Sequence, residues 1–144
     1  MDDGYAHITS VKANCGADKA FADLSSLKRM EEWNLNLSEI EVVADTLAKG
    51  VIPQTGTTLW VQVQADATTH TIHFFVGGSR KRLVPRIMVR VVSGESLGTT
   101  SEQCVISMMA WRLASMDDER WRRLIAAHEY EILQIKTLLE TTWT

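Results

Sequence analysis

The residues best suited to binding an anion form one short basic run. Residues 79–90 contain four arginines and one lysine, although the chain as a whole has a formal net charge of −3. These are Arg80, Lys81, Arg82, Arg86 and Arg90. A guanidinium bonds two oxygens of a phosphate or carboxylate at once and is weakly hydrated. The run predicts contact with RNA, DNA, an anionic membrane or an acidic protein segment. The alternative is that the charges only solubilise a turn.

The histidines and cysteines form no familiar metal or catalytic set. His70 and His73 are three residues apart, so on a strand their rings point to opposite faces of the sheet. No zinc-binding spacing joins them to Cys15 or Cys104. We therefore expect no metal, no cofactor and two reduced, buried thiols.

His128 stands among the apolar residues of the last predicted helix. We expect a buried histidine that is hydrogen bonded within the core. Burial lowers the pKa of an imidazole, which also gives this residue the chemistry of a pH-sensitive switch.

The segment His7-Ile8-Thr9 resembles the start of the histidine, apolar, hydroxyl, apolar motif that 2H phosphoesterases carry twice. The second copy fails, because Ile72 stands where the hydroxyl residue belongs after His70. The resemblance implies, as a remote alternative, a small enzyme that uses His7 or His73. No residue is assigned a catalytic role.

Hydrophobic periodicity and capping signals place the basic run on its predicted scaffold. Residues 5–13 fit a short strand or an ordered arm, and a helix begins at about Ala17. A capping box at Ser38 and Glu41, with Gly50 and Pro53 beyond, predicts a helix over residues 39–49.

Three segments with a period of two follow, at residues 58–65, 70–77 and 85–93. They predict an antiparallel meander with the basic run in its second, exposed link. One face of this sheet is mixed and carries Trp60, His73, Phe75 and Met88. Such a face suits stacking of single-stranded nucleic acid, or it is covered by another segment or subunit.

Two C-terminal helices complete the expected fold. Residues 104–116 are apolar nearly all round, which is typical of a central helix. Residues 117–140 begin with three acids that suit a helix N-terminus. Their apolar stripe and a weaker second stripe suggest an oligomer helix using Trp121, Tyr130 and Leu133.

The expected architecture is a single α+β domain over residues 1–144. It has two N-terminal helices, a meander of about three strands with a further N-terminal strand as an option, and two C-terminal helices packed on the sheet. The first ten residues do not look like a signal peptide, and no segment has the apolar length of a membrane span, so we expect an intracellular protein.

The function expected from these features is that of a non-catalytic, oligomeric binding or assembly protein. It contacts nucleic acid or an anionic membrane through residues 79–90, as a viral matrix-like or nucleic-acid-associated accessory protein does. The alternative is an acidic protein-binding adaptor or chaperone. A homo-oligomer and a protein partner are the expected partners.

Overall fold

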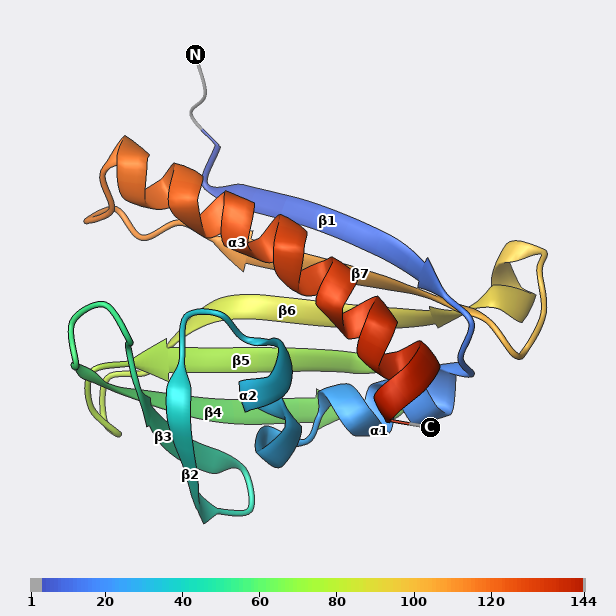
Figure 1. Ribbon diagram of the computed structural model, residues 1–144, viewed down its shortest axis with the longest axis horizontal. Helices are drawn as coiled ribbons and strands as arrows, with labels where there is room; N and C mark the ends of the chain where they lie inside the picture. Colours follow the sequence, from blue (N-terminus) through green and yellow to red (C-terminus); the bar gives the residue numbers. More distant parts are fainter. Residues whose placement is uncertain (1–3, 144) are drawn as a thin grey trace.

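Residues 4–143, which the computed structural model describes, form an antiparallel sheet of seven strands with a long helix across one face (Figure 1). The strand order is β1-β7-β6-β5-β4-β3-β2. The strands are β1 (Ala6–Ala13), β2 (Ser38–Ala44), β3 (Leu47–Val51), β4 (Thr58–Asp66), β5 (Thr71–Gly77), β6 (Val84–Ser93) and β7 (Cys104–Trp111). The α-helices are α1 (Ala17–Leu24), α2 (Met30–Trp33) and α3 (Asp118–Thr137). Short 3₁₀ turns lie at Leu27–Arg29 and Gly94–Leu97, and a π-helical turn at Leu138–Thr142 extends α3.

The core lies between the sheet and the helices. Alternate side chains of each central strand face inward and are buried, as Val61 and Phe74 are. The helix α3 meets them with Ile132 and Ile135, both fully buried. Asp117 caps α3 by accepting a hydrogen bond from the Arg120 backbone N–H at 2.7 Å.

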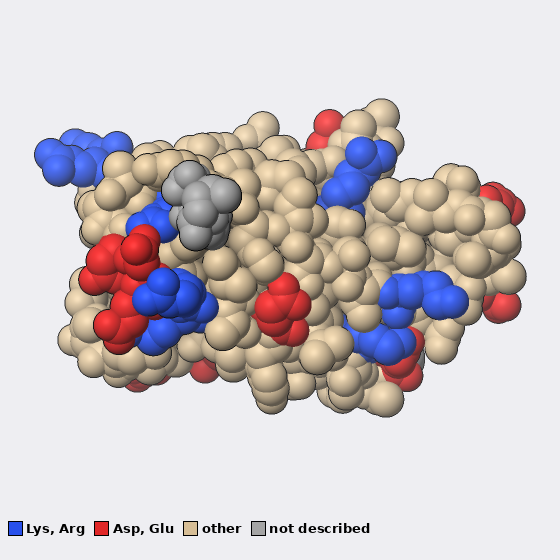
Figure 2. All heavy atoms as spheres, turned by 90° about the horizontal axis from the view of Figure 1, so that it is seen from above, with Lys and Arg blue, Asp and Glu red and all other residues tan. Residues whose placement is uncertain are grey.

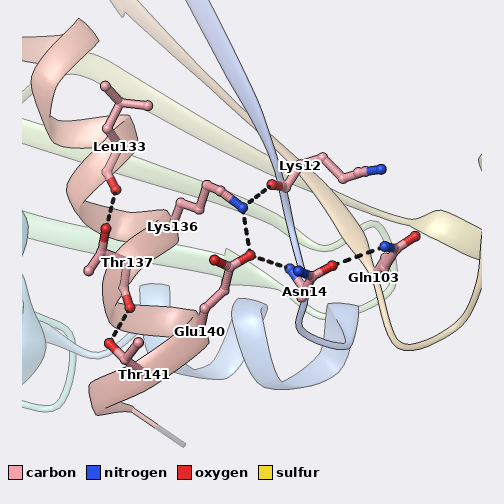
Figure 3. Close-up of polar contacts among 8 residues, drawn as sticks. All are labelled: Lys12, Asn14, Gln103, Leu133, Lys136, Thr137, Glu140 and Thr141. Carbon is pink, nitrogen blue, oxygen red and sulfur yellow. Dashed lines mark hydrogen bonds and ion pairs between the residues drawn. The ribbon is translucent and has the colours of Figure 1, made fainter.

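A polar network fixes the C-terminal end of α3 to the end of β1 (Figure 3). The Glu140 carboxylate accepts from the Lys136 ammonium at 2.6 Å and from the Asn14 backbone N–H at 2.7 Å. The Lys136 ammonium also donates to the carbonyl of Lys12 at 3.0 Å, and Gln103 donates to the Asn14 side chain at 2.9 Å. These contacts set the position of the helix along the sheet.

The helix expected over residues 39–49 is wrong, because this stretch is the hairpin of β2 and β3. The capping-box residues pair across strands instead, since Ser38 lies opposite Val51 and Glu41 opposite Lys49. Gly50 is a strand residue with the Leu37 side chain against it, not a helix cap. The β-branched residues of β2 suit a strand, and that preference outweighs a four-residue capping signal.

The helix expected over residues 104–116 is also wrong, because Cys104–Trp111 is strand β7. Its buried side chains alternate with half-buried ones, and it pairs with β1 on one side and β6 on the other. A central strand with apolar residues on both faces has no clear period of two. That is why the segment resembled a central helix.

The expected sheet of about three strands is wrong, because residues 4–143 form a sheet of seven strands. The three strands are present and adjacent as β4, β5 and β6, but they are the middle of a sheet that continues on both sides. The optional N-terminal strand is present as β1, and the long C-terminal helix is present as α3. The helix from Ala17 ends at Leu24 and is followed by the short α2.

Candidate functional site

A cavity of about 80 Å³ lies between α3, α2 and the inner face of the sheet, and it opens partly to the surface. Its walls are mainly apolar. They include Leu59, Val61, Phe74 and Val76 from the sheet and Leu124 from α3. The link between α2 and β2 closes one side with Leu37. A pocket with apolar walls and a few convergent polar groups is the usual form of a small-molecule site.

Two side chains that line the cavity carry buried polar atoms without a hydrogen-bond partner. Within residues 4–143, the indole nitrogen of Trp33 and both ring nitrogens of His128 have none. Each of the two residues is 1% exposed. Buried polar groups are nearly always paired in folded proteins, so an unpaired group at a cavity indicates a place where a ligand atom or water bonds.

Glu131 lies one helical turn beyond His128, and it is 1% exposed too. Its Oε2 accepts a hydrogen bond from the Leu35 backbone N–H at 2.7 Å, which ties the link before β2 to α3. Its Oε1 lies 3.8 Å from the His128 Nε2, too far for a hydrogen bond, and has no other partner among the described residues.

Burial holds both members of this pair neutral near pH 7. It raises the pKa of Glu131 to about 8, although the hydrogen bond from Leu35 acts in the opposite direction. Burial also lowers the pKa of His128 to about 4, with smaller contributions from the nearby His7 and Arg86. The cavity is therefore lined by an uncharged imidazole, and a protonated carboxyl lies beside that imidazole, 3.8 Å away.

A β-bulge turns Arg86 toward this cavity. Phe74 pairs with Ile87 and Phe75 with Pro85, so Arg86 is the extra residue in β6. Arg86 and Ile87 are consecutive, yet both line the cavity, which regular alternation along a strand does not allow. Burial lowers the pKa of Arg86, and the positive charge of Arg120 adds to this effect.

Two residues of the site, His128 and Arg86, were named from the sequence, whereas Trp33 and the neighbouring Glu131 were missed. His128 is buried with a lowered pKa, as expected, but the expected hydrogen bond within the core is wrong. Glu131 had a signal, because an acid three residues after His128 lies on the helix face that carries Ile135. The signal for the inward turn of Arg86 was Pro85, because a proline within a strand is typical of a bulge or an edge strand.

The basic run does not form one surface. Arg80 lies over the ring of Trp60, 5.2 Å from its centroid, and Lys81 and Arg82 are exposed in the link between β5 and β6. Arg86 turns inward, and its Nε donates to the Trp111 carbonyl at 3.1 Å.

Arg90, the last residue of the run, is exposed on the opposite face of β6 from the buried Val89 and Val91. Figure 2 shows basic and acidic atoms interspersed on the face that carries β1 and α3.

The residues assigned to the mixed sheet face lie on the face away from α3. His73 pairs with Gln64 and Met88 in neighbouring strands, and Phe75 with Gln62. Trp60, His73, Phe75 and Met88 are all half-buried. No comparison tests whether a partner meets them, and this contact stays a prediction.

The residues assigned to an oligomer helix separate in the structure. Trp121 is buried, whereas Tyr130 and Leu133 are 56% and 58% exposed. Of these three residues, Tyr130 and Leu133 are therefore accessible to a partner and Trp121 is not.

Two of the other histidines, His7 and His70, form ion-pair contacts, and His73 contacts the ring of Phe75. His7 lies 2.7 Å from the Glu129 carboxylate, and His70 lies 2.9 Å from Asp18. Among residues 4–143, no group of three or more His, Cys, Asp or Glu side chains could hold a metal ion.

Two further sequence-based points concern the cysteines and the membrane. Cys15 and Cys104 are buried and form no disulfide, and burial raises the pKa of the Cys104 thiol to about 11. None of the helices described between residues 4 and 143 has the length and apolarity needed to cross a bilayer.

No protein-family model and no curated protein matches the sequence. Solved structures do match the fold. An uncharacterised protein from Bacillus thuringiensis has a TM-score of 0.69 at 10% identity, over 93% of this chain and 98% of that one. A START superfamily protein from Mycobacterium smegmatis has a TM-score of 0.69 at 9% identity, over 94% and 97%. The di-domain ARO/CYC BexL from the BE-7585A biosynthetic pathway has a TM-score of 0.67 at 11% identity, over 92% of this chain and 45% of its own.

These neighbours overturn the expected description of an oligomer that binds nucleic acid or anionic lipid through a basic loop. None of them points to a matrix-like or nucleic-acid-associated role. The physical reason is that Arg86 turns into the cavity, while Lys81 and Arg82 lie in the link between β5 and β6 and Arg90 lies farther along β6 on the far face of the sheet. Contact of Arg80, Lys81 or Arg82 with some protein partner is not tested and stays a prediction. What the geometry and the neighbours establish together is a START-like fold, in which a long C-terminal helix packs across a large antiparallel sheet.

Proposed function

We propose that the protein binds a small, mainly apolar molecule in the cavity between α3, α2 and the strands β4 to β6. The observation that carries this proposal is the set of unpartnered buried atoms on Trp33 and His128 in otherwise apolar walls. Leaving such atoms without a bond costs about 1–3 kcal/mol each. A ligand that bonds them recovers part of that free energy.

The fold supports the proposal. A protein of the same fold, BexL, serves a biosynthetic pathway, which favours a small molecule over a macromolecule as the occupant here. The cavity is also separate from the basic run, apart from Arg86, so the ligand meets a single guanidinium rather than a charged surface.

A binding screen with a blocked variant tests the proposal. Small apolar and amphipathic molecules are screened by ligand-detected NMR against the wild-type protein and Leu124→Trp, whose larger side chain fills the cavity mouth from α3. The matched control is Leu133→Trp, because Leu133 lies on the same helix and is exposed. We expect binders of the wild type to lose affinity for Leu124→Trp and to keep it for Leu133→Trp. Molecules that bind both variants as tightly as the wild type would bind outside the cavity, and this result would contradict the proposal.

A further inference from the structure

The proposed ligand site contains a positive charge that the protein itself does not neutralise. Burial and the charge of Arg120 are the influences on Arg86, and no acid among residues 4–143 forms an ion pair with its guanidinium. Arg112 provides the contrast, because its guanidinium donates to the Asp118 carboxylate at 2.8 Å. A half-buried guanidinium without a counter-charge is costly unless an anion accompanies it.

The hydrogen bonds of Arg86 leave donors available. Its Nε bonds the Trp111 carbonyl, and its Nη2 has only the thioether sulfur of Met116 at 4.0 Å, which is a weak acceptor. A guanidinium carries five N–H donors in a planar fork. The fork therefore keeps N–H groups for an oxygen acceptor.

Other polar groups at the cavity offer donors as well. The Trp33 indole only donates, and a neutral His128 imidazole offers one donor and one acceptor. Glu131 does not line the cavity but, held protonated by burial, carries an O–H beside His128. The side chains of Asn34 and Asn36 also line the cavity and offer both donors and acceptors. Arg86 is the charged donor among these lining groups, and its charge favours an oxygen acceptor with negative charge. A carboxylate supplies two such oxygens in the geometry that a guanidinium prefers.

We propose, building on the proposed function, that the ligand is a small carboxylic acid whose carboxylate meets Arg86 and whose apolar body packs against Phe74, Val76 and Leu124. The enclosed volume of about 80 Å³ is smaller than the roughly 150 Å³ of an engineered cavity that takes benzene. It holds the carboxylate and a few carbon atoms, and the rest of the body extends through the open side. An amine or guanidine ligand is disfavoured by the charge of Arg86.

Three probes with the same chain and different ends test this on the wild-type protein. Hexanoate, 1-hexanol and hexylammonium are titrated while the indole ¹⁵N–H signal of Trp33 is followed by NMR. We expect hexanoate to bind about 10- to 100-fold more tightly than hexanol, the ratio for a hydrogen bond to a charged group. Hexylammonium should bind most weakly, and the Trp33 signal should shift with hexanoate.

The outcomes separate the two proposals. If hexanol binds as tightly as hexanoate and shifts the Trp33 signal, the carboxylic-acid inference is wrong while a small-molecule cavity stands. If none of the probes moves that signal, both proposals fail.

A matched pair of variants assigns the effect to one guanidinium. Arg86→Met keeps an unbranched apolar stem and removes the guanidinium with its charge, and it should reduce the preference for hexanoate to near unity. Arg90→Met makes the same change four residues along β6 on the exposed face, and it should leave the preference intact. An unchanged preference in Arg86→Met would overturn the assignment. Should that variant not fold, the wild-type comparison of the three probes still decides the question.

Discussion

Replacing Glu131 by glutamine should remove the fall in the free energy of unfolding that Glu131 causes as pH rises. The folded-state pKa of about 8 lies above the 4.5 of the free side chain. As pH rises between these values, the unfolded chain gives up the proton while the folded chain keeps it. The free energy of unfolding therefore falls with rising pH in this window. Glutamine mimics the protonated acid, keeps an acceptor for the Leu35 N–H, and cannot titrate.

The size of the effect follows from the two pKa values. Between pH 7 and 9, the Glu131 contribution to the free energy of unfolding falls by roughly 1 kcal/mol, because the folded carboxyl itself ionises within this range. His128 has the opposite sign, because its folded pKa of about 4 lies below 6.5. The contribution of His128 to the free energy of unfolding therefore rises with pH between 4 and 6.5. In the wild type, this rise and the fall due to Glu131 largely cancel near pH 5 to 6.5. In Glu131→Gln the free energy of unfolding should therefore rise with pH over this range.

The assay is urea unfolding followed by tryptophan fluorescence and circular dichroism at pH 5, 6, 7, 8 and 9. The groups that act on the pair are His7 from β1, Arg86 from β6 and Glu129 on α3. Glu119→Gln therefore serves as the control, because Glu119 is an exposed acid at the start of the same helix and is not among these groups. The difference in unfolding free energy between Glu131→Gln and wild type should grow in favour of the variant by roughly 1 kcal/mol from pH 7 to 9. A difference that is the same at every pH would mean that the folded Glu131 carboxyl does not titrate in this range, and the raised pKa would be refuted.

Three further predictions concern the scaffold. Glu140→Gln should destabilise the protein by ~1 kcal/mol at pH 7. The partners of this carboxylate, first Lys136 and then the Asn14 N–H, lower its pKa, so the loss should vanish as pH falls through that lowered value. Gly77→Ala should destabilise by about 1–3 kcal/mol, since a Cβ there overlaps the carbonyl oxygen of Arg82. The Cys104 thiol should resist labelling at pH 8 in the native protein, because its pKa is raised to about 11 by burial.

Each of these has a direct check. Denaturant unfolding at pH 7 and pH 3 measures the Glu140 effect, and an unchanged loss at the lower pH would contradict it. Gly78→Ala is the control for the glycine, because nothing lies within 4 Å of a Cβ there. Equal losses of stability in Gly77→Ala and Gly78→Ala would show that overlap of the new Cβ with the Arg82 carbonyl is not the cause. Rapid, stoichiometric modification of Cys104 without denaturant would show that the thiol is accessible.

The strands with clean alternation were predictable, and the segments where two signals compete were not. Residues 58–65, 70–77 and 85–93 alternate because one face of each strand meets the core and the other meets solvent. Residues 104–111 show no such alternation, because β7 lies between β1 and β6 and is mainly apolar on both faces. Their sequence therefore did not predict a strand. The capping box at Ser38 predicted a helix for another reason. It is a local signal of four residues, and the hydrogen bonds that β2 and β3 form as part of the sheet, where β3 pairs with β4, outweigh it.

The candidate site was predictable only where it lies on a regular helix. His128 follows from the apolar stripe of α3, and Glu131 follows from the same stripe once an acid on it is treated as unusual. The charge of Arg86 was noticed, but its direction depends on pairing between β5 and β6 that spacing in one segment does not encode.

The bulge in β6 means that the polarity of the cavity depends on strand length as well as on residue type. Removing the single inserted residue at position 86 would restore ordinary pairing with β5. The cavity would lose its cation while Ile87, Phe74 and the other walls kept their places. Gain or loss of one residue in this strand would therefore change the charge inside the cavity, although no residue that lines it had been substituted.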